Sequence, residues 1–300
     1  MKYVVTGGAG FIGSNIVKLL VKNGHDVSVI DNLHTGNISR LKDVENKILF
    51  NKIDIRDFDK LNQNIHDVDG IFHQAALTVV PESFEKPDEY YDVNVNGTKN
   101  IFKIAKKLGV KVVFASSSSI YGNVNEIPIK ENFKKNPINP YGKTKVEKEK
   151  LAQDFWRDGV GIIGLRYFNV YGKGQTGSYA GVITQFMKKI DNSLPPIIHG
   201  KGDQVRDFVS VEDVAKANLK SMEAGTTQDF LNIGTGKSVS ILELAKLMIK
   251  ISSKNLEPIF DDELPGDVEK SQADTVHSME KIGWSYEIEL DDGLKKLMIG

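Results

Sequence analysis

The chain of 300 residues and 33.3 kDa is long enough for one large domain, or for two smaller domains that share a core. Its composition is that of a globular protein, and its balance of 39 basic and 40 acidic residues makes nucleic acid an unexpected partner. It contains no cysteine, which excludes disulfides, thiolate metal sites and a cysteine nucleophile, and we expect no metal site.

The N-terminal segment turns into glycines at Gly7, too early for the apolar stretch of a signal peptide. The sequence also lacks an apolar run of about 18 residues, the length that crosses a bilayer. We therefore expect a cytoplasmic protein with no membrane partner.

Short apolar runs alternate with segments of helical periodicity through the first half of the chain. Strands are expected at residues 3–5, 26–30, 48–53, 70–73, 111–115 and 160–167, and helices at 11–22, 88–108 and 141–157. This alternation predicts an α/β protein with a doubly wound parallel sheet of the Rossmann type. Further along, the expected strands (197–198, 229–233 and 256–260) are short and unevenly spaced. We therefore expect a Rossmann domain at 1–167 and a smaller α/β substrate domain at 168–300, with some chain returning to the first domain.

A glycine-rich turn connects the first expected strand to the first expected helix. Glycines allow a tight turn and a close approach of the backbone, and a helix N-terminus offers free N–H groups to a phosphate. The pattern predicts a dinucleotide site formed by Gly7, Gly10, Phe11, Ile12 and Gly13. A tight turn without a ligand is the alternative.

Acidic residues end the next two strands. Asp31, followed by Asn32, stands where a carboxylate accepts hydrogen bonds from the ribose hydroxyls of adenosine and repels a 2′-phosphate. Because no arginine lies within eight residues of Asp31, NAD is favoured over NADP. Asp54 and Ile55 follow the third strand, where a polar edge and an apolar face would suit adenine. A polar turn after the strand is the alternative for Asp31.

The fifth strand runs into four consecutive serines, and Tyr141 and Lys145 follow on a predicted helix. Their spacing of four places both side chains on one helix face. A tyrosine acts as a base near pH 7 only if its pKa falls by about 3 units from about 10, which a nearby ammonium and a nicotinamide cation favour. The alternative is a tyrosine that only packs.

In these motifs the chain resembles the extended short-chain dehydrogenases/reductases, and among them the nucleotide-sugar 4-epimerases such as UDP-glucose 4-epimerase. The similarity covers almost the full length, and it also rests on His73-Gln74-Ala75-Ala76-Leu77, Asn94-Val95-Asn96-Gly97-Thr98, Leu165 to Gly172 and Arg206-Asp207-Phe208-Val209. The resemblance implies Ser117 as the catalytic hydroxyl, because it lies four residues before Tyr121, although the run of serines leaves its neighbour open.

The resemblance also implies the remaining site residues. Near NAD it places Gln74, Ala75, Ala76, Asn94 and Phe168, together with Tyr141 and Lys145. Near the substrate it places Thr78, Asn169, His199, Arg206, Asp267 and Ser271, together with Ser117 and Tyr141. Simpler alternatives are a surface ion pair of Arg206 with Asp203 or Asp207, a solvent-exposed His199 and a surface-loop Ser271.

The chain departs from these relatives at one motif. They typically carry Arg-x-Gly-Asp where this chain has Leu264-Pro265-Gly266-Asp267, so a second phosphate-binding arginine is missing. Uridine recognition is therefore less secure, unless a nearby lysine replaces the arginine.

The resemblance implies a homodimer, joined through helices 88–108 and 141–157, that epimerises a UDP-hexose at C4 with NAD through a 4-keto sugar. Ser271 stands where small residues resemble enzymes that also accept N-acetylhexosamines, so UDP-GlcNAc and UDP-GalNAc are expected beside UDP-glucose and UDP-galactose. Epimerisation or decarboxylation of UDP-glucuronate remains open. A 4,6-dehydratase is disfavoured because residues 117–120 contain no acid, and a redox-sensing binding protein would need neither Tyr141 nor Lys145.

Overall fold

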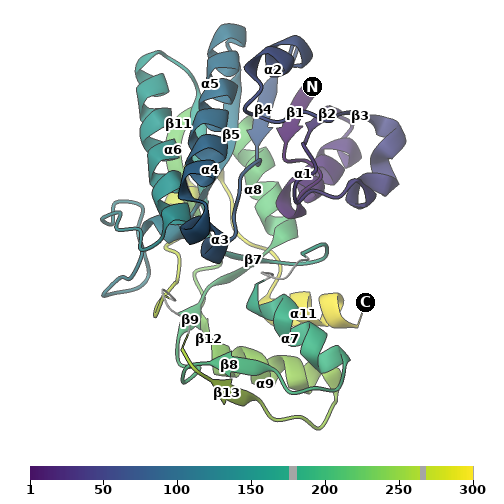
Figure 1. The fold of residues 1–300 in the computed structure, drawn as a ribbon, viewed down its shortest axis with the longest axis vertical. Helices are drawn as coiled ribbons and strands as arrows, with labels where there is room; N and C mark the ends of the chain where they lie inside the picture. The colour runs from purple at the N-terminus through teal and green to yellow at the C-terminus, as the bar shows by residue number, and fades with distance from the viewer. Residues whose placement is uncertain (176–180, 264–267, 300) are drawn as a thin grey trace.

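The computed structural model describes residues 1–175, 181–263 and 268–299. Seven parallel strands form the central sheet in the order β11-β6-β5-β4-β1-β2-β3 (Figure 1). Their bounds are β1 (Lys2–Thr6), β2 (Asp26–Ile30), β3 (Ile48–Asn51), β4 (Gly70–His73), β5 (Lys111–Ser117), β6 (Ile162–Tyr167) and β11 (Gln228–Ile233). This strand order confirms the predicted doubly wound fold, whose strand ends at the switch point form ligand sites.

Helices cover both faces of the sheet because its strands are apolar on both sides. Val4 and Val5, neighbours on β1, are both fully buried, one in each of two hydrophobic cores. One core lies under α1 (Phe11–Lys22) and α8 (Val211–Glu223), and the other under α2 (Phe58–Asn64), α5 (Gly97–Leu108) and α6 (Pro140–Arg157). Parallel strands covered in this way are typical of α/β proteins.

The long helix predicted at 88–108 is interrupted in the structure. It consists of α4 (Pro87–Tyr91), a π-helical turn at Asp92–Asn96 and α5. Single π turns within helices are frequent at functional sites. This one holds Asn94, whose buried amide bonds both the N–H (2.8 Å) and the carbonyl (3.0 Å) of Leu77. Short elements that the sequence analysis omitted are α2, α3 (Val80–Glu85) and the 3₁₀ segment η1 (Ile38–Lys47).

The remaining elements form a smaller unit at the carboxyl ends of the strands (Figure 1). They are β7 (Asn169–Tyr171), α7 (Val182–Asp191), β8 (Ile197–His199), β9 (Val205–Arg206), β10 (Phe208–Ser210), β12 (Val239–Ser240), α9 (Ile241–Ser252), β13 (Ile259–Asp261) and α11 (Leu290–Met298). Helices α7, α9 and α11 share a separate apolar core that includes Phe186, Met248 and Leu294. Within the range 168–300, however, β11 joins the main sheet, and α8 and α10 (Val276–Ile282) pack with it. A division at residue 167 stays a prediction.

No helix in the described part of the chain is long and apolar enough to cross a membrane.

A buried ion pair fastens α6 to the sheet. Arg166 on β6 donates two hydrogen bonds to the carboxylate of Glu149 on α6, at 2.9 and 2.8 Å, and both side chains are almost fully buried. Glu149 also accepts from Ser116 at the end of β5 (2.7 Å) and pairs with Lys135 (2.6 Å). Burial alone would raise the pKa of Glu149, but the bonds and charges of Arg166 and Lys135 bring it below its ordinary value.

Glu149→Gln should therefore lower the free energy of unfolding by about 3 kcal/mol or more, because it leaves the Arg166 charge buried and uncompensated. Urea denaturation measures the loss. Glu147→Gln on the same helix is the control, since Glu147 is partly exposed and paired only with Lys150, and its loss should stay within about 1 kcal/mol. Equal losses in the two variants would contradict this role.

Candidate active site

The glycine turn between β1 and α1 has no room for side chains. Gly7 has a left-handed φ of +66°, and a Cβ there would lie 2.6 Å from the Ala75 nitrogen. A Cβ on Gly13 would lie 2.1 Å from the Gly7 oxygen. Gly10 is the N-cap of α1 and offers no side-chain hydrogen bond, so the first N–H groups of the helix can serve a ligand. This arrangement fits the pyrophosphate of a dinucleotide.

Asp31 is held in a fixed orientation at the end of β2. Its carboxylate accepts hydrogen bonds from the N–H groups of Ala9 (3.0 Å) and Leu33 (2.8 Å). Burial raises the pKa of Asp31, and these two bonds and the charge of Arg40 partly oppose the rise. Gly36 makes room for the carboxylate, since a Cβ at that position would lie 2.6 Å from Asp31 Oδ1. These contacts fix Asp31 in a groove between the glycine turn and the end of β2, so the alternative of a simple polar turn does not describe it.

Two arginines approach this groove, although none lies close to Asp31 in sequence. Arg40 donates to the carbonyls of Ala9 and Gly174, each at 3.1 Å. Arg56 forms a bidentate pair with Asp54, and their hydrogen bond is the main reason that the pKa of Asp54 is lowered. Since both guanidinium groups serve protein partners, the site favours NAD over a cofactor with a 2′-phosphate.

The groove collects most of the predicted cofactor residues. Those that line it are Gly7, Gly10, Asp31, Asn32, Asp54, Ile55, Gln74, Ala75 and Ala76. The sequence analysis missed Ile30, His34, Thr35, Gly36, Ile53, Arg56, Leu77, Glu89 and Val93, which also line it. Only Thr35 and Gly36 carried a visible signal, as a small-residue turn soon after Asp31. The predicted Asn94 lies behind the groove and supports it through Leu77.

The three predicted catalytic residues meet at the carboxyl ends of β5 and β6. Asn139 caps α6, which puts Tyr141 in the first helical turn and faces it toward Ser117 at the end of β5. One turn further, Lys145 Nζ lies 5.3 Å from the centre of the Tyr141 ring and donates to the Ala115 carbonyl (2.9 Å). Among the serines, Ser116 bonds Glu149, and Ser117 is the one in hydrogen-bonding range of Tyr141, which favours Ser117 over Ser118.

The protein groups around Tyr141 do not by themselves lower the pKa of its phenol. Burial raises the pKa of Tyr141 to about 12, and only the hydrogen bond with Ser117 opposes the rise. Burial also lowers the pKa of Lys145 to about 7, with Glu149 opposing the change. The fall in tyrosine pKa expected from the sequence therefore requires charges that arrive with the ligands.

A second lysine and a histidine lie behind Lys145. Lys148 is fully buried, and its Nζ, 5.4 Å from the centre of the Phe114 ring, has no hydrogen-bond partner among the described residues. Burial, and then the charge of Lys145, hold the pKa of Lys148 well below its ordinary value. Burial also lowers the pKa of His73, whose ring nitrogens contact the hydroxyls of Thr6 (2.7 Å) and Thr98 (2.8 Å). The interior behind the site therefore carries little positive charge.

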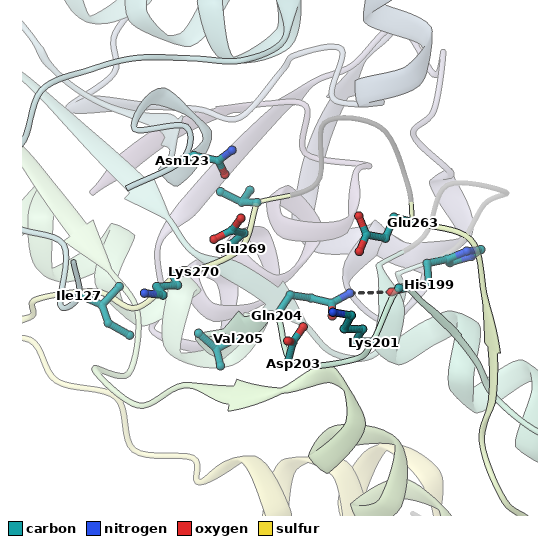
Figure 2. A pocket seen from close by; sticks show the side chains of 12 residues that line it. Asn123, Ile127, His199, Lys201, Asp203, Gln204, Val205, Glu263, Glu269 and Lys270 are labelled. Atoms are coloured by element: carbon teal, nitrogen blue, oxygen red, sulfur yellow. Dashed lines mark hydrogen bonds between the residues drawn. The ribbon is translucent and has the colours of Figure 1, made fainter. Parts of the chain in front are cut away.

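A larger cavity, of about 640 Å³, lies between the smaller unit and the loop that precedes α6 (Figure 2). It is lined by Asn123, Ile127, His199, Gly200, Lys201, Asp203, Gln204, Val205, Glu263, Val268, Glu269 and Lys270. Figure 2 shows Gln204 between Lys201 and Asp203, with its amide donating to the His199 carbonyl at 2.9 Å. Only His199 was a predicted site residue, and its ring nitrogen Nδ1 contacts the Asp262 carbonyl (3.1 Å).

The other predicted substrate residues take varied positions. Arg206 is buried and donates to the Val205 carbonyl (2.8 Å), so the alternative of a surface ion pair is wrong. Ser271 is also buried, and its N–H donates to the same Val205 carbonyl, which excludes a surface-loop serine. Thr78 is exposed, Asn169 begins β7 and Phe168 is buried before it. Leu264 and Asp267 lie outside the described residues.

Comparison with known proteins agrees with this geometry. The model of the NAD dependent epimerase/dehydratase family matches residues 3–234. A UDP-glucose 4-epimerase of Lactobacillus helveticus is 36% identical, with 95% of this chain and 92% of the relative covered.

Two solved structures superpose closely, each with a TM-score of 0.95. One is a UDP-glucose 4-epimerase from Thermotoga maritima with UDP-glucose, 36% identical over 99% of this chain and 97% of the other. The other is a UDP-N-acetylglucosamine 4-epimerase from Methanobrevibacter ruminantium in complex with UDP-N-acetylmuramic acid, 35% identical over 99% and 96%.

The fold and site define a dinucleotide-dependent enzyme. They combine a Rossmann sheet, a glycine turn, an aspartate at the end of the second strand and a serine–tyrosine–lysine set. The chain belongs to the NAD dependent epimerase/dehydratase family.

Lys148→Met should raise the free energy of unfolding at pH 7. The unfolded chain holds a protonated lysine up to a pKa of about 10.4, whereas buried Lys148 binds its proton weakly, so wild-type stability rises with pH up to that value. The gain from the substitution should shrink as pH approaches about 10.4. Thermal unfolding from pH 6 to 10 measures it, with exposed Lys143→Met as the control. A destabilised Lys148→Met protein at pH 7 would contradict the expectation.

Proposed function

We propose that this chain is a UDP-hexose 4-epimerase that interconverts UDP-glucose and UDP-galactose with NAD as its cofactor. The observation that carries the proposal is the meeting of Ser117, Tyr141 and Lys145 in a chain of this family. Asn94 connects them to the dinucleotide groove, because its amide bonds Leu77 in the groove and Thr144 on α6. The relatives named as UDP-glucose 4-epimerases cover nearly its whole length.

The glycine turn and Asp31 would hold NAD, which would supply a hydride acceptor and donor for C4 of the sugar. Tyr141 takes the proton of the O4 hydroxyl as the 4-keto sugar forms and gives it back as the product forms. Ser117, in hydrogen-bonding range of Tyr141, holds the same oxygen. Lys145, fixed by the Ala115 carbonyl, provides positive charge near the phenol and stabilises the phenolate.

The larger cavity is proposed to hold the nucleotide of the substrate. Lys270, which lines the cavity, supplies positive charge for the diphosphate and compensates for the arginine replaced by Leu264. Arg206, buried next to the lining residue Val205, is the second proposed source of positive charge. Asn169, His199, Asp267 and Thr78 remain predicted contacts of the substrate.

Ser271 supports a wider sugar range. It is a small buried residue beside Val205, which lines the cavity, and the Methanobrevibacter relative is named for an N-acetylated sugar. We infer that UDP-GlcNAc and UDP-GalNAc are also interconverted.

We also propose a homodimer that forms through α4, α5 and α6. Exposed aromatic residues, Phe84 on α3 and Tyr91 on α4, suit such a contact, whereas the exposed Lys103, Lys106 and Lys107 mark the end of α5 that stays in solvent. Sedimentation equilibrium of a dimer would give a mass of twice the 33.3 kDa of one chain.

The cytoplasmic location stays a prediction.

Tyr141→Phe should reduce turnover by about 100-fold or more, since it removes the group that moves the proton. The NAD content of the purified variant should match that of wild type, because the ring remains in place. Coupled assays with UDP-galactose measure turnover, and Tyr286→Phe is the control, since the Tyr286 hydroxyl contacts Glu289 away from the site. Retained turnover in Tyr141→Phe would exclude this base.

Ser271→Tyr should suppress interconversion of the N-acetylated pair and spare UDP-glucose and UDP-galactose. A phenol in place of a hydroxymethyl group fills the space that a 2-acetamido group needs. Proton NMR of both sugar pairs measures the two rates, and Ser271→Ala should keep both. Equal loss of the two activities, or of neither, would show that Ser271 does not select the sugar.

A further inference from the structure

Arg40 connects two parts of the molecule that are far apart in sequence. It lies on the 3₁₀ segment η1, after the loop that follows Asp31. Its Nη1 donates to the carbonyl of Ala9 in the glycine turn, and its Nε donates to the carbonyl of Gly174, beyond β7 (each 3.1 Å). Figure 1 shows the chain after β7 extending toward α1. Arg40 thus connects the expected cofactor site to the smaller unit.

Both backbone polar groups of Ala9 are hydrogen-bonded. Its N–H donates to Asp31 (3.0 Å), and its carbonyl accepts from the Asn37 N–H (2.9 Å) as well as from Arg40. Ala9 is fully buried and directly precedes Gly10, the N-cap of α1. The bond from Arg40 therefore acts on the turn that presents N–H groups to a pyrophosphate.

The segment 172–175 lies directly against this site. Gly174 has a φ of +96°, and a Cβ there would lie 3.8 Å from Arg40 Nε and 4.0 Å from the Phe11 ring. On its other side, Gln175 donates to the Val170 carbonyl (3.3 Å) and accepts from Thr184 on α7 (2.8 Å). The segment is therefore tied to the smaller unit by Gln175 and to the Rossmann sheet by Arg40.

We propose that Arg40 is a positioning residue that slows the release of NAD, by fastening the segment 172–175 to the glycine turn. The inference rests on the proposed function, in which the sugar exchanges in each cycle while the cofactor stays. A dinucleotide at the start of α1 leaves past a segment that Arg40 holds in place. The planar guanidinium of Arg40 has several N–H donors in a fixed arrangement, so it can bond the carbonyls of Ala9 and Gly174 together. A lysine ammonium is a single point charge without this geometry.

The test measures NAD release from protein loaded with NAD, in the absence of any sugar. The loaded protein is diluted into alcohol dehydrogenase and ethanol, which convert released NAD to fluorescent NADH. Loss of hydrogen bonds from a charged donor should make release about ten- to a hundred-fold faster in Arg40→Met. Arg40→Lys should restore part of the retention. Arg157→Met is the matched control, because Arg157 is mostly exposed and pairs only with Asp154, and its release rate should equal that of wild type.

The unfolding temperature of the NAD-free proteins separates retention from folding. If Arg40 acts on release, this temperature changes little while the release rate rises. An unchanged release rate in Arg40→Met would overturn the proposal. So would a loss of stability in the NAD-free variant with release as slow as in wild type, because Arg40 would then only support the fold. Slow release from a wild-type protein that epimerises no UDP-sugar would refute the proposed function alone, and a wild type that bound no NAD would refute both.

Discussion

The ion pair between Arg166 and Glu149 fixes the position of α6 against the sheet. Its two buried side chains join β6 to α6, and Glu149 extends the connection to Ser116 at the end of β5. The same guanidinium donates to the Tyr121 hydroxyl and the Glu131 carbonyl, each at 2.8 Å. Because Tyr141 and Lys145 are on α6 and Ser117 follows Ser116, this network sets the distance between the proposed base and its serine. A buried pair gains little net stability over apolar residues, but it fixes one arrangement of its neighbours when its partners are satisfied.

Burial disfavours charge on the side chains around Tyr141. Burial raises the pKa of Tyr141 and lowers the pKa values of Lys148 and His73, so the neutral form of each side chain is favoured. Two ammonium groups one helical turn apart in a dry interior repel each other, and this repulsion adds to burial in lowering the pKa of Lys148. Burial, opposed only by the hydrogen bond with Ser117, thus favours the protonated form of Tyr141.

The sequence predicted the elements whose pattern is local. The alternation of strands and helices predicted the parallel doubly wound sheet, though not the order of its strands. The glycine turn, Asp31 and the four-residue spacing of Tyr141 and Lys145 predicted a dinucleotide site and one face of α6. Long-range partners were not predictable, because no local pattern marks them. Arg40 reaches Gly174 across 134 residues, Glu149 meets Arg166 from another element, and Gln204 lines a cavity built by separate loops. The π turn at Asn94 was hidden within an ordinary helical pattern, since the packing of one buried amide against Leu77 determines it.

The central claim is that one hydride leaves C4 and returns to the same carbon while NAD remains bound. The most direct measurement uses UDP-galactose labelled with deuterium at C4 and the purified protein without added cofactor, followed by NMR. The account predicts UDP-glucose that retains the deuterium at C4. Loss of the label to solvent, or no conversion while UDP-glucuronate releases carbon dioxide, would contradict it.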